Sequence, residues 1–182
     1  MSVNDPFDQG LRRRMEARLK EEFEIAESDA MILAARRKKL SDLAWEASQA
    51  GQVVRVTVGK RRLEGLPVYA RNDLMTLRCR HGKAEVRLTG IDALMVTSTE
   101  EEGRPETQSI GSFLSRMGLL QLTDEDFEVV CIGGEPTFRG RIGHVARDHM
   151  AVITAIGQVN VALARLAYVI HQPSSRNRMR RF

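Results

Sequence analysis

Residues 54–96 read VRVTVGKRRLEGLPVYARNDLMTLRCRHGKAEVRLTGIDALMV, and residues 129–170 read VVCIGGEPTFRGRIGHVARDHMAVITAIGQVNVALARLAYVI, so that the second stretch follows the pattern of the first. Gly59 aligns with Gly133 at a spacing of 74 residues, and after a gap of one residue Gly65 aligns with Gly140 at a spacing of 75. The spacing of 75 then relates further pairs, among them Asp73/Asp148, Met75/Met150, Gly82/Gly157, Val86/Val161 and Leu88/Leu163. Because the matches fall on glycines and alternating apolar residues, they predict a duplicated architecture and leave the function open.

Each copy has the pattern of a small antiparallel sheet. Residues 54–58 alternate between apolar and polar side chains, which is the period of a strand with one buried face, and residues 77–80 and 84–88 repeat this alternation. Gly59-Lys60, Asn72-Asp73 and His81-Gly82 are turn signals between these runs. We therefore expect four or five short, strongly bent strands per copy.

The order of strands and glycines, with an aspartate at the same position of each copy, resembles that of a small SH3-like barrel, and more narrowly that of the Sm and Hfq family of RNA-binding barrels. The resemblance lies on Gly59, Gly65, Asp73, Leu77, Gly82, Val86 and Ile91 in the first copy, and on Gly133, Gly140, Asp148, Val152, Gly157, Val161 and Leu166 in the second. The arrangement is also similar to that of a group of actinobacterial proteins. The places where this family has its characteristic closing strand read Leu88-Thr89-Gly90-Ile91 and Leu163-Ala164-Arg165-Leu166, so none of its base-binding residues is transferred.

The fold class that follows is α+β, mainly β: two tandem SH3-like or Sm-like small antiparallel barrels preceded by a long N-terminal amphipathic helix. The expected organisation is a helical segment over 1–51, a first barrel over 52–96, an acidic loop and short linking helix over 97–125, a second barrel over 126–170 and a basic tail over 171–182. Neither copy is long enough to bury a sufficient core alone, so we expect them to pack on each other or on a helix.

The N-terminal segment has the features of a long amphipathic helix. Asp5 and Pro6 suit its first positions, apolar residues recur every three or four positions, and Gly51 is a typical residue after a helix end. Ser28 offers a second starting point, so a break near it stays open. The apolar stripe of this helix permits a homodimer through residues 6–50. The alternative is a scaffold helix that packs only its C-terminal half on the barrels. The linking helix is expected between residues 110 and 121.

Positive charge is unevenly distributed over the 182 residues. The formal net charge of the whole chain is +4, but residues 52–96 carry nine basic and four acidic side chains, and the last twelve residues carry four arginines and no acid. By strand alternation Arg78, Arg80 and Arg87 share an outer face of the first barrel, with Arg55 adjacent. The full set of candidate nucleic-acid-binding residues is Arg55, Lys60, Arg61, Arg62, Arg78, Arg80, Arg87, Arg176, Arg178, Arg180 and Arg181.

Signals for catalysis, metal binding and export are missing from the sequence. The two cysteines and four histidines form no Cys-x-x-Cys or His-x-x-x-His pair, and no nucleotide-binding glycine loop or hydrolase motif occurs. We therefore expect a protein that is not an enzyme and needs no cofactor or metal. The apolar runs are too short to span a bilayer and the start is not a signal peptide, so a cytoplasmic protein without membrane contact is expected.

Two functions remain. The first is nucleic-acid binding, to RNA or DNA, through the basic face of the first barrel and the arginine-rich tail, with little sequence specificity because aromatic residues for base stacking are scarce. The alternative is a protein-interaction scaffold that dimerises through the N-terminal helix and binds an acidic protein with its basic face.

Overall fold

The computed structural model describes residues 6–80, 82–100, 105–107 and 111–171, with side chains from residue 15 onward apart from those of residues 98–100. The chain divides into two compact units, residues 1–39 and residues 40–182, and each is described by itself. None of the described helices is long and apolar enough to cross a membrane.

The first unit is a single helix, α1 (Pro6–Arg37), and the second unit begins with a separate helix, α2 (Leu40–Gln49). The sequence predicted one run ending near Gly51, or a break near Ser28, whereas the helix is interrupted at Lys38 and Lys39. The interruption falls within the four adjacent cations of residues 36–39, at the point where the exposed helix α1 gives way to α2, which has a buried face. All described side chains of α1 are exposed, while α2 buries one face, including Ala44 and Ala47.

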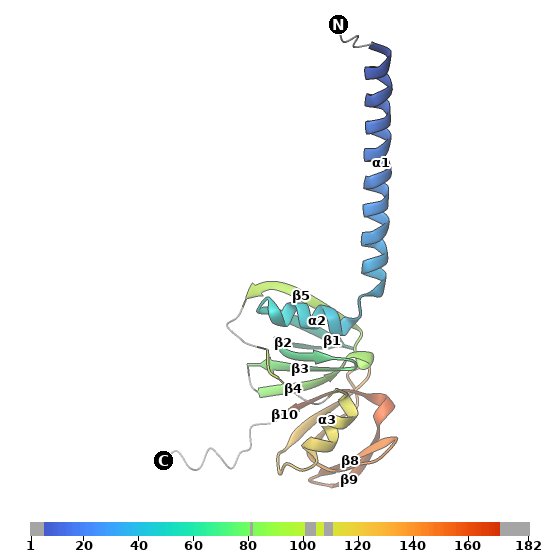
Figure 1. Ribbon diagram of the computed structural model, residues 1–182. Coiled ribbons are helices and arrows are strands. Elements are labelled where there is room, and N and C mark those ends of the chain that lie inside the picture. The colour runs from blue at the N-terminus through green and yellow to red at the C-terminus, as the bar shows by residue number, and fades with distance from the viewer. Residues whose placement is uncertain (1–5, 81, 101–104, 108–110, 172–182) are drawn as a thin grey trace. The chain divides into compact units, whose positions relative to one another are not determined.

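The second unit is built around antiparallel strands (Figure 1). They are β1 (Gln52–Val58), β2 (Arg61–Arg71), β3 (Leu74–Cys79), β4 (Gly82–Arg87), β5 (Ala93–Glu100), β6 (Phe127–Cys131), β7 (Thr137–Val145), β8 (His149–Thr154), β9 (Gly157–Ala162) and β10 (Leu166–His171). Their order across the sheet is β5-β1-β2-β3-β4-β10-β6-β7-β8-β9. A helix, α3 (Phe113–Leu120), precedes β6 and lies within the stretch for which the sequence predicted a short helix.

The same series of elements recurs along the chain. The bounds of β8 and β9 follow those of β3 and β4 at an offset of 75 residues, and so do the bounds of two short 3₁₀ turns, η1 (Leu88–Gly90) and η2 (Leu163–Arg165). Each series has the strand order fifth-first-second-third-fourth, so the first half of the sheet is β5-β1-β2-β3-β4 and the second is β10-β6-β7-β8-β9.

Glycine allows the second strand of each half to bend. The N-terminal part of β2 pairs with β1 and its C-terminal part with β3, and β7 divides its pairing between β6 and β8 in the same way. At these bends a Cβ atom on Gly65 would lie 2.6 Å from the Arg78 carbonyl oxygen, and one on Gly140 would lie 2.0 Å from the Ile153 carbonyl oxygen. Such close approach of two backbones requires glycine.

The structure confirms the predicted α+β class, with strand as the main element. The described strands form one ten-stranded antiparallel sheet, because β4 and β10 pair across the boundary between the halves, and this sheet is not closed into a barrel. The cores of the halves also interpenetrate. Tyr168 of β10 belongs to the cluster under α2, and Leu74 of β3 belongs to the cluster under α3.

Candidate nucleic-acid interface

Arg78 lies near the C-terminal end of β3 and Arg80 follows the strand in the next turn, and both side chains are exposed. Alternation holds only at this end of the strand, where Leu77 is fully buried and Cys79 is half-buried, because Thr76, on the same side of β3 as Arg78, is fully buried as well. Together with Gly65 of β2 the two arginines border a cleft of about 470 Å³, whose lining residues are Val53, Glu64, Gly65, Arg78, Cys79 and Arg80. Of the predicted residues, these two arginines are brought together in a concave surface.

Arg55 lies beside this cleft but is held by an ion pair. Its Nε and Nη2 atoms are 2.9 and 2.8 Å from Oε2 of Glu64, which faces it across the β1–β2 ladder. The pair is largely exposed, so it is weak and a phosphate can compete for the guanidinium. Glu64 nevertheless reduces the positive charge at one wall of the cleft.

The basic residues Lys60, Arg61 and Arg62, at the β1–β2 turn and the start of β2, differ in their surroundings. Lys60 and Arg62 are exposed. Arg61, in contrast, donates a 2.7 Å hydrogen bond from Nη1 to Glu128 Oε1 in β6, and this contact raises the pKa of the guanidinium above its ordinary value. Arg61 therefore joins the two halves of the sheet.

Arg87 is also engaged in the fold. The alternation that predicted an outer position is broken here, because Nη1 of Arg87 donates a hydrogen bond to the Leu163 carbonyl oxygen and the side chain is half-buried. Glu85, two residues earlier on the same side of β4, is completely buried. The face of β4 that the sequence assigned to solvent is thus covered by the second half of the chain and by α3. The remaining predicted residues, Arg176, Arg178, Arg180 and Arg181, lie outside the described residues.

Sequence reasoning missed the charged network around Glu85. Oε1 of this carboxylate lies 2.7 Å from Arg116 Nη2 in α3, its Oε2 accepts a 2.6 Å hydrogen bond from Thr76, and His171 Nε2 is 3.7 Å away. Burial alone would raise the pKa of Glu85, but the neighbouring His171, Thr76 and Arg116 outweigh burial and hold it below its ordinary value. The available signal was Arg116, a lone cation within an otherwise apolar and small helix.

His171 belongs to the same network. Its Nδ1 is 2.9 Å from Glu125 Oε2. Burial tends to lower the pKa of the imidazole, but the carboxylates of Glu85 and Glu125 raise it above the usual value. Because Glu85 contacts Arg116 of α3 and lies 3.7 Å from His171 of β10, the network is suited to holding α3 and β10 against β4.

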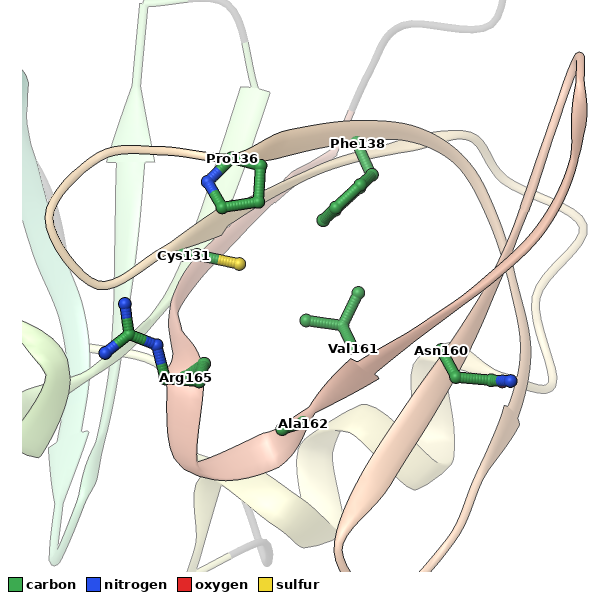
Figure 2. Close-up of a pocket in the computed structure, with 7 residues that line it drawn as sticks. All are labelled: Cys131, Pro136, Phe138, Asn160, Val161, Ala162 and Arg165. Atoms are coloured by element: carbon green, nitrogen blue, oxygen red, sulfur yellow. The ribbon is translucent and has the colours of Figure 1, made fainter.

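A second, mainly apolar pocket of about 190 Å³ lies in the other half of the sheet (Figure 2). Its lining residues are Cys131, Pro136, Phe138, Asn160, Val161, Ala162 and Arg165. The pKa of the Cys131 thiol is raised by burial, so it stays protonated and is a poor nucleophile. Among the described residues, no three His, Cys, Asp or Glu side chains come together as a metal site.

No known protein family, curated protein sequence or solved structure matches the chain.

Proposed function

We propose that the protein binds nucleic acid, RNA or DNA, through the cleft at the end of β3. The observation that supports this most directly is that Arg78 and Arg80 border one concave surface. Lys60 in the β1–β2 turn and Arg62 near the start of β2 are also exposed and add positive charge to the first half of the sheet. Guanidinium groups match phosphate oxygens, so this surface suits a polyanion.

The proposed interaction is with the backbone rather than with the bases. The pocket lining includes no aromatic side chain, and stacking on aromatic rings is the usual means by which single-stranded bases are held. Binding should therefore show little sequence preference and should weaken steeply with salt, as counterion release requires. The arginine-rich segment 176–181 is proposed to add further phosphate contacts.

We further propose that each half of the sheet is an SH3-like unit of the Sm-like type. The support is the repeated series of helix, four strands, 3₁₀ turn and fifth strand, with the fifth strand paired to the first in both halves. The resemblance stated from the sequence falls on the glycines at the bends of the second strands, Gly65 and Gly140.

The binding experiment is a fluorescence polarisation titration of labelled RNA and DNA oligonucleotides of mixed sequence over a range of salt concentrations. For four phosphate contacts on a single strand, the logarithm of the affinity should fall with the logarithm of salt with a slope of about −3. Absence of binding at low salt would remove the proposal.

A second candidate function is a scaffold that dimerises through α1 and binds an acidic protein. It is favoured by the large apolar side chains exposed on this helix, such as Leu19 at 62% and Phe23 at 71% exposure. Replacing both with Glu should then lower the mass measured by light scattering and leave oligonucleotide affinity unchanged. An unchanged mass would exclude α1 as the dimer contact.

A further inference from the structure

An apolar stripe runs along α1, which is one continuous helix (Figure 1). Apolar residues recur there at steps of three or four positions and therefore share one face of the helix; they are Met15, Leu19, Phe23, Ala26, Ala30 and Leu33. Because all described side chains of α1 are exposed, no other described part of the chain covers this stripe.

Charge along the same helix falls into two blocks of opposite sign. Residues 12–20, the basic block, comprise five basic residues and one acidic residue, and residues 21–29, the acidic block, comprise five acidic residues and no basic one. The boundary between the blocks lies close to the midpoint of α1, which runs from Pro6 to Arg37. A helix with this pattern is complementary to a second copy of itself that runs in the opposite direction.

The two possible directions of a second copy bring different charges together. In a parallel pair in register, every position of the acidic block lies beside the same position of the second copy, and like charges placed together are unfavourable. In an antiparallel pair centred on Glu21, residues 12–20 of one copy lie opposite residues 22–30 of the other. Because such a contact is two-fold symmetric, the basic block meets the acidic block twice.

The apolar stripe fits the same antiparallel arrangement. With the pair centred on Glu21, Leu19 of each copy lies beside Phe23 of the other, and Met15 lies beside Ala26. A parallel pair would instead set Phe23 against Phe23 and Ala26 against Ala26. A large side chain that faces a small one allows the two helices to keep an even separation along the stripe.

Charged residues on both sides of the stripe suit this register as well. With about 3.6 residues per turn, Arg18 and Glu22 lie on one side of the stripe, and Lys20 and Glu24 lie on the other. The antiparallel pair brings Arg18 near Glu22 of the second copy and Lys20 near Glu24 of the second copy. Lys20 is 3.9 Å from Glu24 of its own helix, but both side chains are largely exposed, so this pair is weak and can exchange.

We propose that α1 of one copy of this chain packs antiparallel against α1 of a second copy, with Leu19 beside Phe23 and the basic block opposite the acidic block. The proposal rests on the second candidate function, dimerisation through α1, and adds the direction and register of the helices. Because the contact is two-fold symmetric, it is complete with two copies. The C-terminal ends of the two helices lie about 48 Å apart along the axis of the pair.

Cysteine cross-linking in the full-length chain distinguishes the two directions. Met15→Cys protein is mixed with Ala26→Cys protein under mild oxidation. In the antiparallel register the two positions are offset by about 1.5 Å along the axis, whereas in a parallel pair they are roughly 16 Å apart. A disulfide needs Cα atoms within about 7 Å. The wild type gives the background, since Cys131 is buried and burial raises the pKa of Cys79 to about 11.

The matched control is Met15→Cys mixed with Leu33→Cys. Leu33 lies on the same stripe and is 54% exposed, against 59% for Met15, but it is about 9 Å along the axis from the position opposite Met15. The mixed disulfide of Met15→Cys with Ala26→Cys should form well above this control. A yield equal to the control, or disulfides of Met15→Cys only with itself, as a parallel pair would give, would overturn the proposal.

Light scattering over a range of concentrations tests the charge pattern. Replacing Arg18 and Lys20 together by Glu should weaken the association roughly tenfold, because the ion pairs between the copies become contacts of like charge. Adding Glu22→Lys and Glu24→Lys to this variant should restore the association.

The control for the charge test replaces Arg36 and Arg37 by Glu, which is the same change of charge outside both blocks. This variant should associate as the wild type does. An unchanged association after replacement of Arg18 and Lys20, or an equal loss in the control, would overturn the proposal.

The outcomes separate this proposal from the functions proposed above. A mass of one chain at every concentration would overturn dimerisation through α1 together with its direction. A dimer that fails the cross-linking test would overturn the antiparallel direction alone. Nucleic-acid binding at Arg78 and Arg80 uses residues outside α1, so it can persist in either case.

Discussion

Arg116 of α3 lies 2.7 Å from Glu85 of β4, and the Glu85 side chain has no exposed surface. This pair fixes the helix between the two halves to the strand at their boundary. A carboxylate buried to this extent needs compensation by charge and hydrogen bonds, because its desolvation is costly. The packing of α3 on β4 therefore depends on the guanidinium of Arg116.

Replacement of Arg116 by Leu should destabilise the protein strongly. It leaves Glu85 with Thr76 and His171 as partners, and removal of one member of a buried pair costs roughly 3–5 kcal/mol. The free energy of unfolding from urea titration measures the loss. Arg116→Leu combined with Glu85→Gln should recover part of it; if the single variant is as stable as the wild type, the pair does not hold α3.

Stability should depend on pH through the same network. The folded-state pKa of Glu85 is lowered, so its contribution is present above the ordinary value of 4.5 and is lost as pH falls through the folded-state pKa. The pKa of His171 is raised, so its contribution is present below 6.5 and is lost as pH rises through the folded-state pKa. Between these values both groups stabilise the fold.

The measurement for this prediction is the unfolding free energy at a series of pH values for the wild type and His171→Gln. The wild type should lose stability above pH 6.5, and the variant should lose less. His144→Gln, which replaces an exposed histidine, is the control and should follow the wild type. Parallel curves for all three proteins would contradict the assignment.

Gly140 should tolerate no side chain. A Cβ atom there would lie 2.0 Å from the Ile153 carbonyl oxygen, so the backbones of β7 and β8 must separate. Gly140→Ala is expected to cost roughly 2–3 kcal/mol in the unfolding free energy. Gly118→Ala is the control: it has open space in α3 and should stabilise the protein by up to about 1 kcal/mol.

Arg61 should matter more for stability than for ligand binding. Arg61→Gln removes an ion pair to Glu128, whose side chain is only 10% exposed, and should cost about 1.5–3 kcal/mol. If it instead weakens oligonucleotide binding without changing the unfolding curve, Arg61 belongs to the interface.

The recurring part of the fold could be predicted from the sequence. The glycine spacing and apolar alternation predicted where the strands and bends lie, because a strand with one buried face and a backbone crossing at Gly65 or Gly140 are local requirements. The break at Lys38 and Lys39 could not be seen by periodicity, which continues across it. The helix breaks there because side chains become buried only from α2 onward.

The candidate site could be predicted only in part, because alternation along one strand does not show which residues contact the other half of the sheet. Alternation correctly separated Arg78 from Leu77, since both belong to one strand. The partners of Arg61 and Arg87 lie 67 and 76 residues away in the other half, so local patterns could not distinguish these arginines from solvent-facing ones. Burial of Glu85 depends in the same way on α3.

The most direct test of the proposed function compares two charge-matched variants in the oligonucleotide titration. One carries Arg78→Glu with Arg80→Glu; the other carries Arg147→Glu with Arg165→Glu, two exposed arginines of the second half. Nucleic-acid binding at the β3 cleft predicts that the first variant loses most of its affinity and has a shallower salt dependence, while the second stays close to the wild type. Equal losses in both variants, or no loss in the first, would contradict it.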